Sequence, residues 1–207
     1  NTRPRARFEL PQAGSLVREG ERVKYRVRVE DPEDGRNIDN GRVKVELGLK
    51  RGNLVTVIDR ADGVSGELLL GPEPEGDPNS KPQIVLTATY TDNGSGSVGA
   101  LSGRADVTLQ TRRIEAERAT ATKGTQVESK NDATGKPTTA LAFIEDGDSA
   151  SFSPVRMDGV RAVRVRVSSA TSGGVVELRL GGAKGQLIGV GQVASTGSWT
   201  TWREIET

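Results

Sequence analysis

Hydrophobic and charged residues alternate along several short stretches of the chain. The alternation is clearest at 23–29, 43–47, 162–167 and 175–180. Successive side chains of a β-strand point to opposite faces, so each stretch predicts a strand with one buried and one solvated face. The pattern is typical of antiparallel sheets that are covered on one side only.

Turn-forming residues separate these stretches, in clusters at 31–35, 71–82, 91–96 and 172–174. Gly, Pro, Asn and Asp favour turns because they supply or tolerate the backbone angles that turns need. No segment of ten or more residues shows the periodicity of an amphipathic helix. Short strands at regular intervals predict an all-β protein built from β-sandwiches.

A domain boundary is predicted at 111–113, where two arginines follow a threonine. The stretch 105–109 before this point has the pattern of a closing strand, and 114–117 after it has the pattern of an opening strand. Two β-sandwich domains in tandem are therefore expected, residues 1–112 and residues 113–207, and both have ordinary domain size.

The composition excludes several classes of function. The 29 basic and 28 acidic residues nearly cancel, so no net field would attract nucleic acid. No segment has the apolar length of a membrane-spanning helix, and membrane insertion is not expected. The chain contains neither Cys nor His, which excludes thiol nucleophiles, imidazole acid–base chemistry and the usual zinc ligand sets.

Both tryptophans, Trp199 and Trp202, lie close to the end of a chain in which aromatic residues make up only 3%. In an extended strand, residues three apart point to opposite faces, so one indole would pack inward and the other outward. An outward indole among Gly, Ser and Thr suits the flat apolar face of a sugar ring. The alternative is that both rings only pack against the protein.

Six short motifs follow one another in the second half. They are the opening "EAE" at 115–117, the segment 124–128, the stretch from Phe143 to Phe152, the "GG-x-x-x-L-R" strand at 173–179, the "G-x-L-I-G" turn at 185–189, and the Trp-containing segment 196–202. Together they resemble carbohydrate-binding modules of family six, and the resemblance spans nearly everything from Ile114 onward.

This resemblance implies a jelly-roll-like sandwich with a sugar-binding cleft formed by loops at one end. By position, Trp199 and Phe143 would be the two rings that clasp a sugar. Glu128 would accept hydrogen bonds from sugar hydroxyls, with Glu145 or the adjacent Asp146 close by. The alternatives are core packing for Phe143 and a solvated strand-end charge for Glu128.

Glu115 and Glu117 flank one alanine, so in a strand both would project to the same side and repel each other. The resemblance implies a structural Ca²⁺ between them, since hard oxygen ligands at this spacing suit that ion. The alternative is a pair of solvated glutamates.

The resemblance also implies two further strands after the second tryptophan, whereas this chain has five residues after Trp202. A sandwich without these strands would expose unpaired edges. A missing C-terminal segment, or a partner chain that donates a strand, would cover them.

In the first half, the strand-like stretch 23–29 leads into the turn 31–35, and the segment 89–94 lies near the end. With these features the first half resembles bacterial immunoglobulin-like or polycystic-kidney-disease-like domains. The order of the two domains is similar to the accessory tail of secreted bacterial sugar dehydrogenases, in which the first domain is a spacer. The acids Asp31, Glu33, Asp34 and Asp39 could bind Ca²⁺, but an acidic turn between strands is the favoured interpretation.

The expected function is non-catalytic binding of a poly- or oligosaccharide, with a β-glycan favoured, which would target a secreted bacterial enzyme to its substrate. The acids at 145–148 lie in one short turn, and nothing places two of them across a substrate as glycoside hydrolysis requires. The alternative function is an extracellular structural or adhesive protein, or fibre subunit, with a vestigial sugar cleft.

Overall fold

A computed structural model describes residues 1–35, 37–71 and 82–207. The chain is all-β, as predicted, and forms two compact units. The first contains residues 1–113 together with 154–156, and the second contains residues 114–153 and 157–207. Most of the predicted turn cluster at 71–82 lies outside the described residues. Among the described residues, no helix is long and apolar enough to cross a membrane.

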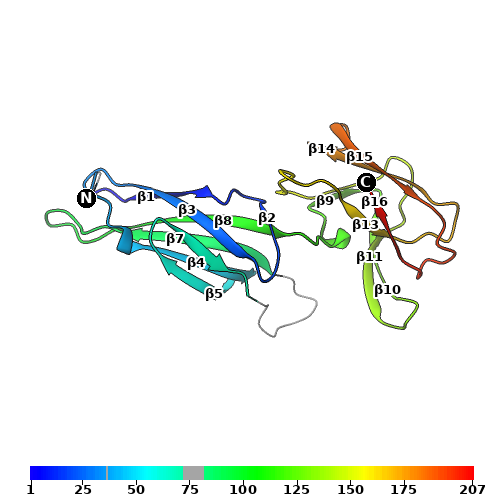
Figure 1. Cartoon of the computed structure of the whole chain (residues 1–207), viewed down its shortest axis with the longest axis horizontal. Helices are drawn as coiled ribbons and strands as arrows, with labels where there is room; N and C mark the ends of the chain where they lie inside the picture. Colours follow the sequence, from blue (N-terminus) through cyan, green and yellow to red (C-terminus); the bar gives the residue numbers. More distant parts are fainter. Residues whose placement is uncertain (36, 72–81) are drawn as a thin grey trace. The chain divides into compact units, whose positions relative to one another are not determined.

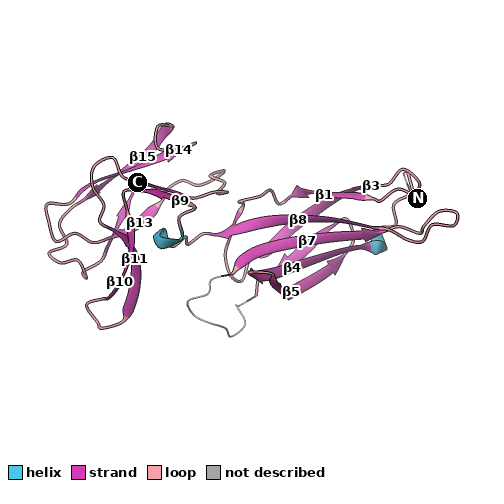
Figure 2. Cartoon of the chain, turned by 180° about the vertical axis from the view of Figure 1, so that it is seen from behind, coloured by secondary structure: helices cyan, strands magenta, loops and turns pink. Residues whose placement is uncertain are grey.

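The described residues of the first unit form eight strands and one short 3₁₀ helix (Figures 1 and 2). In chain order they are β1 (Arg5–Leu10), β2 (Leu16–Val17), β3 (Arg22–Glu30), η1 (Asn40–Arg42), β4 (Val43–Arg51), β5 (Leu54–Asp62), β6 (Ser65–Leu69), β7 (Gln83–Thr91) and β8 (Ser102–Thr111). One sheet has the order β1-β3-β6 and the other has the order β2-β8-β7-β4-β5. All neighbouring strands are antiparallel except β2 and β8.

The core of the first unit is built by the predicted alternation. In β3, the residues Val23, Tyr25 and Val27 are buried, whereas the charged residues between them are exposed. The opposite sheet contributes side chains such as Leu47 and Leu86, which are completely buried. Because each fully buried Leu or Val contributes about 1.5–3 kcal/mol, this layer is the main source of the unit's stability.

Tyr90 is fully buried in this core, and its hydroxyl donates a 2.6 Å hydrogen bond to Asp34 Oδ2. Burial, and then the adjacent Asp34, raise the pKa of Tyr90 from 10.0 to about 12. The raised pKa contributes stability below pH 10, and this contribution is lost as the pH rises through 12. Wild type is therefore expected to lose about 2–3 kcal/mol of unfolding free energy across this window.

Urea unfolding at several pH values checks this prediction. Tyr90→Phe should start less stable by about 1 kcal/mol, because it lacks the hydrogen bond. It should then lose less stability than wild type between neutral and alkaline pH. The pH profile of Tyr25→Phe is measured for comparison with that of Tyr90→Phe, since burial also raises the pKa of Tyr25. Parallel pH profiles for wild type and Tyr90→Phe would contradict the assignment.

The second unit consists of four two-stranded antiparallel sheets, β9–β12, β10–β11, β13–β16 and β14–β15. Its elements are η2 (Ala116–Arg118), β9 (Ala121–Lys123), β10 (Gln126–Asn131), β11 (Pro137–Ala142), β12 (Ser149–Ser151), β13 (Arg164–Val167), β14 (Gly174–Leu180), β15 (Gln186–Val193) and β16 (Arg203–Glu206). Among the described residues of this unit, no apolar side chain is buried as completely as those in the core of the first unit.

The predicted strands correspond to β3, β4, β13 and β14, and the stretch 105–109 is part of β8. The predicted strand at 114–117 is wrong. Ala116–Arg118 form the 3₁₀ helix η2, and the N–H groups of Arg118 and Ala119 donate to the carbonyl oxygens of Glu115 and Ala116. These local hydrogen bonds turn the chain before it can pair with a strand.

Candidate functional site

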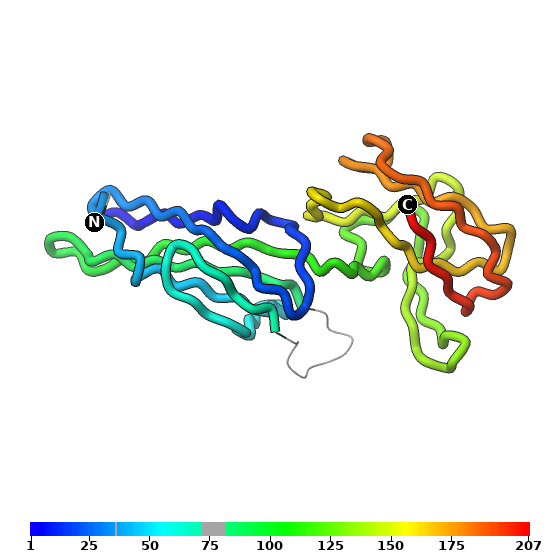
Figure 3. The backbone as a smooth tube through the Cα atoms, viewed as in Figure 1, coloured from blue at the N-terminus to red at the C-terminus, as the bar shows by residue number. Residues whose placement is uncertain are grey.

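Trp199 lies in the loop at 194–202 that connects β15 to the last strand, β16, drawn in red in Figure 3. Its side chain is 52% exposed. The expectation that both tryptophans lie in an extended strand is wrong. Gly197 has φ +80°, and the small polar residues of this loop hydrogen-bond to nearby backbone groups in place of a strand partner.

Hydrogen bonds to Ser169 hold this loop in place. The Thr196 N–H donates to the Ser169 carbonyl oxygen at 2.8 Å, and the Ser169 N–H donates to Thr196 Oγ1 at 2.9 Å. Both residues are buried, and Ser168 Oγ also donates to the Trp199 carbonyl oxygen. The loop backbone that carries the exposed indole is therefore fixed by buried hydrogen bonds, which are costly to break.

Trp202 lies against the protein and is only partly exposed. The Arg166 guanidinium carbon is 5.1 Å from the centre of its ring, within the range of a cation–π contact. Its Nε1 is buried without a hydrogen-bond partner. Trp202 is therefore a packing residue, whereas Trp199 offers its ring to solvent.

Glu128 lies on β10 directly opposite Ala140 of β11. Its side chain is 30% exposed, and Lys130 Nζ lies 3.0 Å from its Oε2. Lys130 neutralises part of the charge but leaves the carboxylate accessible. A carboxylate in this position can accept a hydrogen bond from a ligand hydroxyl, and such charge-assisted bonds are stronger than neutral ones.

The hairpin that carries Glu128 is closed by Asp132. Its Oδ1 accepts hydrogen bonds from the Thr134 hydroxyl at 2.6 Å, the Thr134 N–H at 2.9 Å and the Lys136 N–H at 3.0 Å. The Thr134 hydroxyl and the backbone N–H groups lower the pKa of Asp132, so the carboxylate that organises this turn stays ionised.

Phe143 follows β11 immediately and is 60% exposed. Its φ is 56°, and among the described residues it is the sole non-glycine with positive φ. A bulky residue in this left-handed conformation costs about 1–2 kcal/mol. The fold thus holds an exposed aromatic ring in a strained conformation, which is more common at functional sites than elsewhere.

Phe143→Gly is expected to raise the unfolding free energy of the second unit by about 0.5–1 kcal/mol. Glycine adopts positive φ without strain, and this gain exceeds the entropy that glycine adds to the unfolded chain. Phe143→Ala keeps the strain and serves as the control, so it should not stabilise the unit. Denaturant unfolding followed by tryptophan fluorescence measures both variants. A loss of stability in Phe143→Gly equal to that in Phe143→Ala would argue against backbone strain.

Glu145 lies in a tight turn, and its side chain is exposed. Its N–H donates to Asp148 Oδ2 at 2.8 Å, and the Asp148 N–H donates back to the Glu145 carbonyl oxygen at 3.2 Å. Asp148 also packs against Gly124, where an added Cβ would lie 1.7 Å from its Oδ1. Any side chain at position 124 would therefore displace this turn.

The structure brings some of the predicted residues together. In the register of the hairpin, Gln126 lies opposite Ala142, so Phe143 is at the end where β10 begins and Glu128 is two residues further along. The positions of Phe143 and Glu128 are therefore about 10 Å apart along the strands. Trp199 comes from a different loop, and within the described residues no hydrogen bond or ion pair joins it to the hairpin. The clasp of Trp199 and Phe143 around one sugar remains a prediction.

The two glutamates of the predicted calcium pair are partly buried: Glu115 directly precedes η2, and Glu117 lies within it. Because the chain turns here, the argument that a strand places both carboxylates on one side no longer applies. Among the described residues, no group of three or more acidic side chains could hold a metal ion. The Ca²⁺ site at Glu115 and Glu117 remains a prediction.

Sequence reasoning missed the buried polar residues that support the site. Ser169 and Thr196 fix the loop of Trp199, and Thr125 Oγ1 is buried without a partner one residue before β10. The only available signal was the position of small hydroxyl residues beside Gly in turns, a pattern that is too common to be specific.

Comparison with known proteins identifies a similar protein and a family. Over 99 residues, the chain is 38% identical to the arabinoxylan arabinofuranohydrolase of Bacillus subtilis (strain 168). The aligned region covers 46% of this chain. The chain spans only 19% of the length of that relative. No solved structure matches. The immunoglobulin-like assignment of the first half and the likeness to sugar dehydrogenase tails remain predictions. The second half, residues 115–207, matches the family described as carbohydrate binding module (family 6).

Proposed function

We propose that the second unit is a non-catalytic carbohydrate-binding module that keeps a secreted bacterial enzyme at its polysaccharide. The observation that carries this proposal is the family match at residues 115–207. The first unit would act as a spacer. Tethering raises the local concentration of an enzyme at its substrate without any chemistry by the module itself.

The exposure of two aromatic rings supports the proposal. Trp199 and Phe143 are 52% and 60% exposed, on backbone segments that hydrogen bonds and strand pairing hold in place. The face of a sugar ring is apolar and flat, so it is desolvated favourably by stacking against an aromatic ring. Glu128 and Glu145 would accept hydrogen bonds from the sugar hydroxyls, and these hydrogen bonds would orient the stacked sugar ring.

A β-glycan is the proposed ligand, and arabinoxylan is the first to test, because the similar Bacillus subtilis protein is named for that substrate. Catalysis is not part of the proposal. Glycoside hydrolysis needs two carboxylates about 5–9.5 Å apart on either side of the scissile bond. Glu145 and Asp148 are instead tied to each other within one turn.

A glycan array followed by titration calorimetry tests the function. The array should show binding to β-linked polysaccharides and not to unrelated glycans, and calorimetry with the best soluble ligand should give one site per chain. Assays for released reducing sugar on the same ligands should show no turnover. Failure to bind any glycan on the array would reject the proposed function.

A structural or adhesive role is the second candidate. It is favoured by the second unit, where four separate two-stranded sheets leave strand edges unpaired and where Val127, Ile144 and Val175 are more than half exposed. Such edges can pair with another chain. Analytical ultracentrifugation separates the two candidates, since assembly that grows with concentration in a chain without sugar affinity would favour the structural role.

A further inference from the structure

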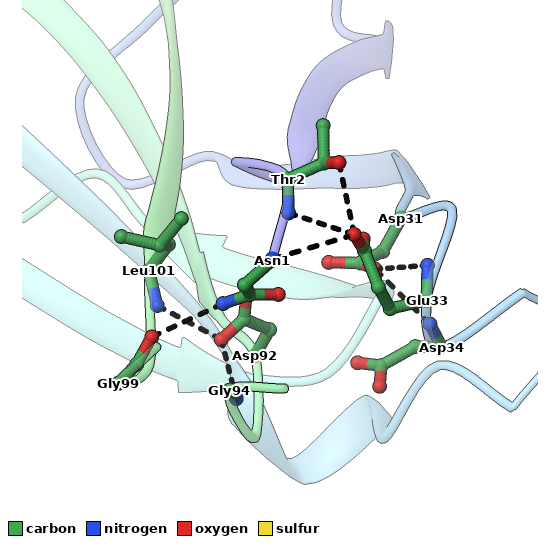
Figure 4. Close-up of polar contacts among 9 residues, drawn as sticks. All are labelled: Asn1, Thr2, Asp31, Glu33, Asp34, Asp92, Gly94, Gly99 and Leu101. Atoms are coloured by element: carbon green, nitrogen blue, oxygen red, sulfur yellow. Dashed lines mark hydrogen bonds and ion pairs between the residues drawn. The ribbon is translucent and has the colours of Figure 1, made fainter. Parts of the chain in front are cut away.

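Four acidic residues gather at one end of the first unit, where the turn after β3 and the loop between β7 and β8 meet the first residues of the chain (Figure 4). Asp31, Glu33 and Asp34 belong to the turn, and Asp92 begins the loop. Of these residues, Asp31 and Asp92 are the most deeply buried, at 4% and 2% exposed. Buried carboxylates require hydrogen bonds or a cation to offset the loss of hydration.

Only one oxygen of the Asp31 carboxylate has its hydrogen bonds satisfied. Oδ1 accepts from the N–H groups of Glu33 at 2.9 Å and Asp34 at 3.0 Å. Oδ2 is buried and has no partner. An ionised carboxylate can only accept hydrogen bonds, so this oxygen lacks a donor or a cation, which is a large cost for a buried charge.

A second orphan oxygen lies beside the first. The Asn1 side-chain nitrogen donates to Asp92 Oδ2 at 3.0 Å and to the Gly99 carbonyl oxygen at 3.1 Å, which fixes the orientation of the amide. Its Oδ1 is also buried without a partner. Figure 4 shows this oxygen and the unpartnered oxygen of Asp31 turned toward the same space. Two acceptors that face each other repel unless a positive group lies between them.

The surrounding charges favour a cation. The Asp92 carboxylate lies beside Asn1, and its Oδ1 accepts hydrogen bonds from the N–H groups of Gly94 and Leu101, both at 2.8 Å. Two positive groups lie nearby. The Asn1 amino group is 3.9 Å from Glu33 Oε1, and Arg42 is directed to the Asp92 carbonyl oxygen at 2.9 Å and to the Asp39 carboxylate at 3.5 Å. Neither group is a hydrogen-bond partner of Asp31 Oδ2.

We propose that Asp31 Oδ2 and Asn1 Oδ1 bind a calcium ion that ties the turn after β3 to Asn1, whose side-chain nitrogen is hydrogen-bonded to the loop that follows β7. Ca²⁺ accepts carboxylate, amide and water oxygens in flexible geometry, whereas Mg²⁺ demands a near-ideal octahedron. Within the described residues no three acidic side chains converge on one point, so water would complete the ligand set. A site with so few protein ligands belongs to the weak class, with a Kd on the order of 0.1–1 mM.

Asp31→Asn gives a sharp test, because its amide nitrogen can replace one carboxylate oxygen and donate to Asn1 Oδ1. The variant is therefore expected to be at least as stable as calcium-free wild type, and its unfolding should not respond to calcium. Glu67→Gln is the matched control. It also removes one carboxylate from the first unit, but at an exposed position that pairs with Lys24, and its calcium response should equal that of wild type.

The experiment titrates CaCl₂ into EDTA-treated full chain and follows unfolding through the tyrosine signal, since both tyrosines lie in the first unit. At 10 mM calcium, wild type and Glu67→Gln should melt roughly 5 °C or more above their calcium-free midpoints, and 10 mM magnesium should have a clearly smaller effect. No shift in wild type, an equal shift in Asp31→Asn, or an equal shift with magnesium would overturn the proposal.

Terbium luminescence keeps the test decisive if Asp31→Asn fails to fold. Tb³⁺ replaces Ca²⁺ at oxygen sites. The Tyr90 hydroxyl lies 2.6 Å from Asp34 in the same cluster, so the tyrosine ring is close enough to sensitise a bound Tb³⁺. Wild type should show tyrosine-excited Tb³⁺ emission that excess calcium removes, and Tyr90→Phe should lose most of this emission. Emission that calcium does not displace would contradict the site. This result is independent of sugar binding, which is assigned to the second unit.

Discussion

Trp199→Ala is expected to weaken binding of a β-glycan by about 60-fold. The indole is 52% exposed in the free protein, so a stacked sugar would cover about 100 Å² of its surface. At about 25 cal/mol per Å², the lost burial is about 2.5 kcal/mol, and each 1.4 kcal/mol corresponds to a tenfold change in Kd. Calorimetry with the soluble ligand identified on the array measures the change.

Two further variants show whether the loss comes from the ring itself. Trp199→Phe keeps an aromatic face of smaller area, so its Kd should lie between those of wild type and Trp199→Ala. Val175→Ala truncates a side chain on β14 that is 57% exposed, and it should bind as wild type does. Wild-type affinity in a folded Trp199→Ala protein would place the sugar elsewhere on the unit.

Strands were predictable where apolar and charged residues alternate regularly. The alternation in β3 is visible in the sequence because the core excludes charge from every second position, and the structure buries Val23, Tyr25 and Val27 accordingly. The same logic located β4, β13 and β14. It failed at 114–117, since four residues are too few for periodicity to separate a strand from a turn. There, local hydrogen bonds of a 3₁₀ turn determine the path.

The sequence motifs selected the candidate site residues, whose role in binding remains a prediction, but they did not indicate the conformation of those residues. The motifs pointed to Trp199 and Phe143, and both side chains are exposed as a binding role requires. No pattern in the sequence indicates that Phe143 has positive φ, or that Trp199 lies in a loop fixed by Ser169 and Thr196. These features depend on contacts between segments that are distant in the sequence, and local propensity does not report such contacts.

The two units are expected to unfold in two separate transitions. The buried apolar core among the described residues comes from the first unit, whereas the second unit consists of two-stranded sheets with many exposed apolar side chains. Because burial of apolar surface is the main favourable term in folding, the second unit should melt first. Both tryptophans lie in the second unit and both tyrosines in the first, so the two spectroscopic signals report the units separately.

Leu47→Ala tests this independence with a large effect. Leu47 is completely buried on β4, and its truncation leaves a cavity that costs about 2–5 kcal/mol. For a domain of about 100 residues, each kcal/mol shifts the melting temperature by about 4–8 °C, so the tyrosine-detected transition should fall by roughly 10 °C or more. The tryptophan-detected transition and the Kd for the glycan should stay unchanged. If both signals instead shifted together, the units would share one cooperative core, and the second would owe its stability to contacts with the first.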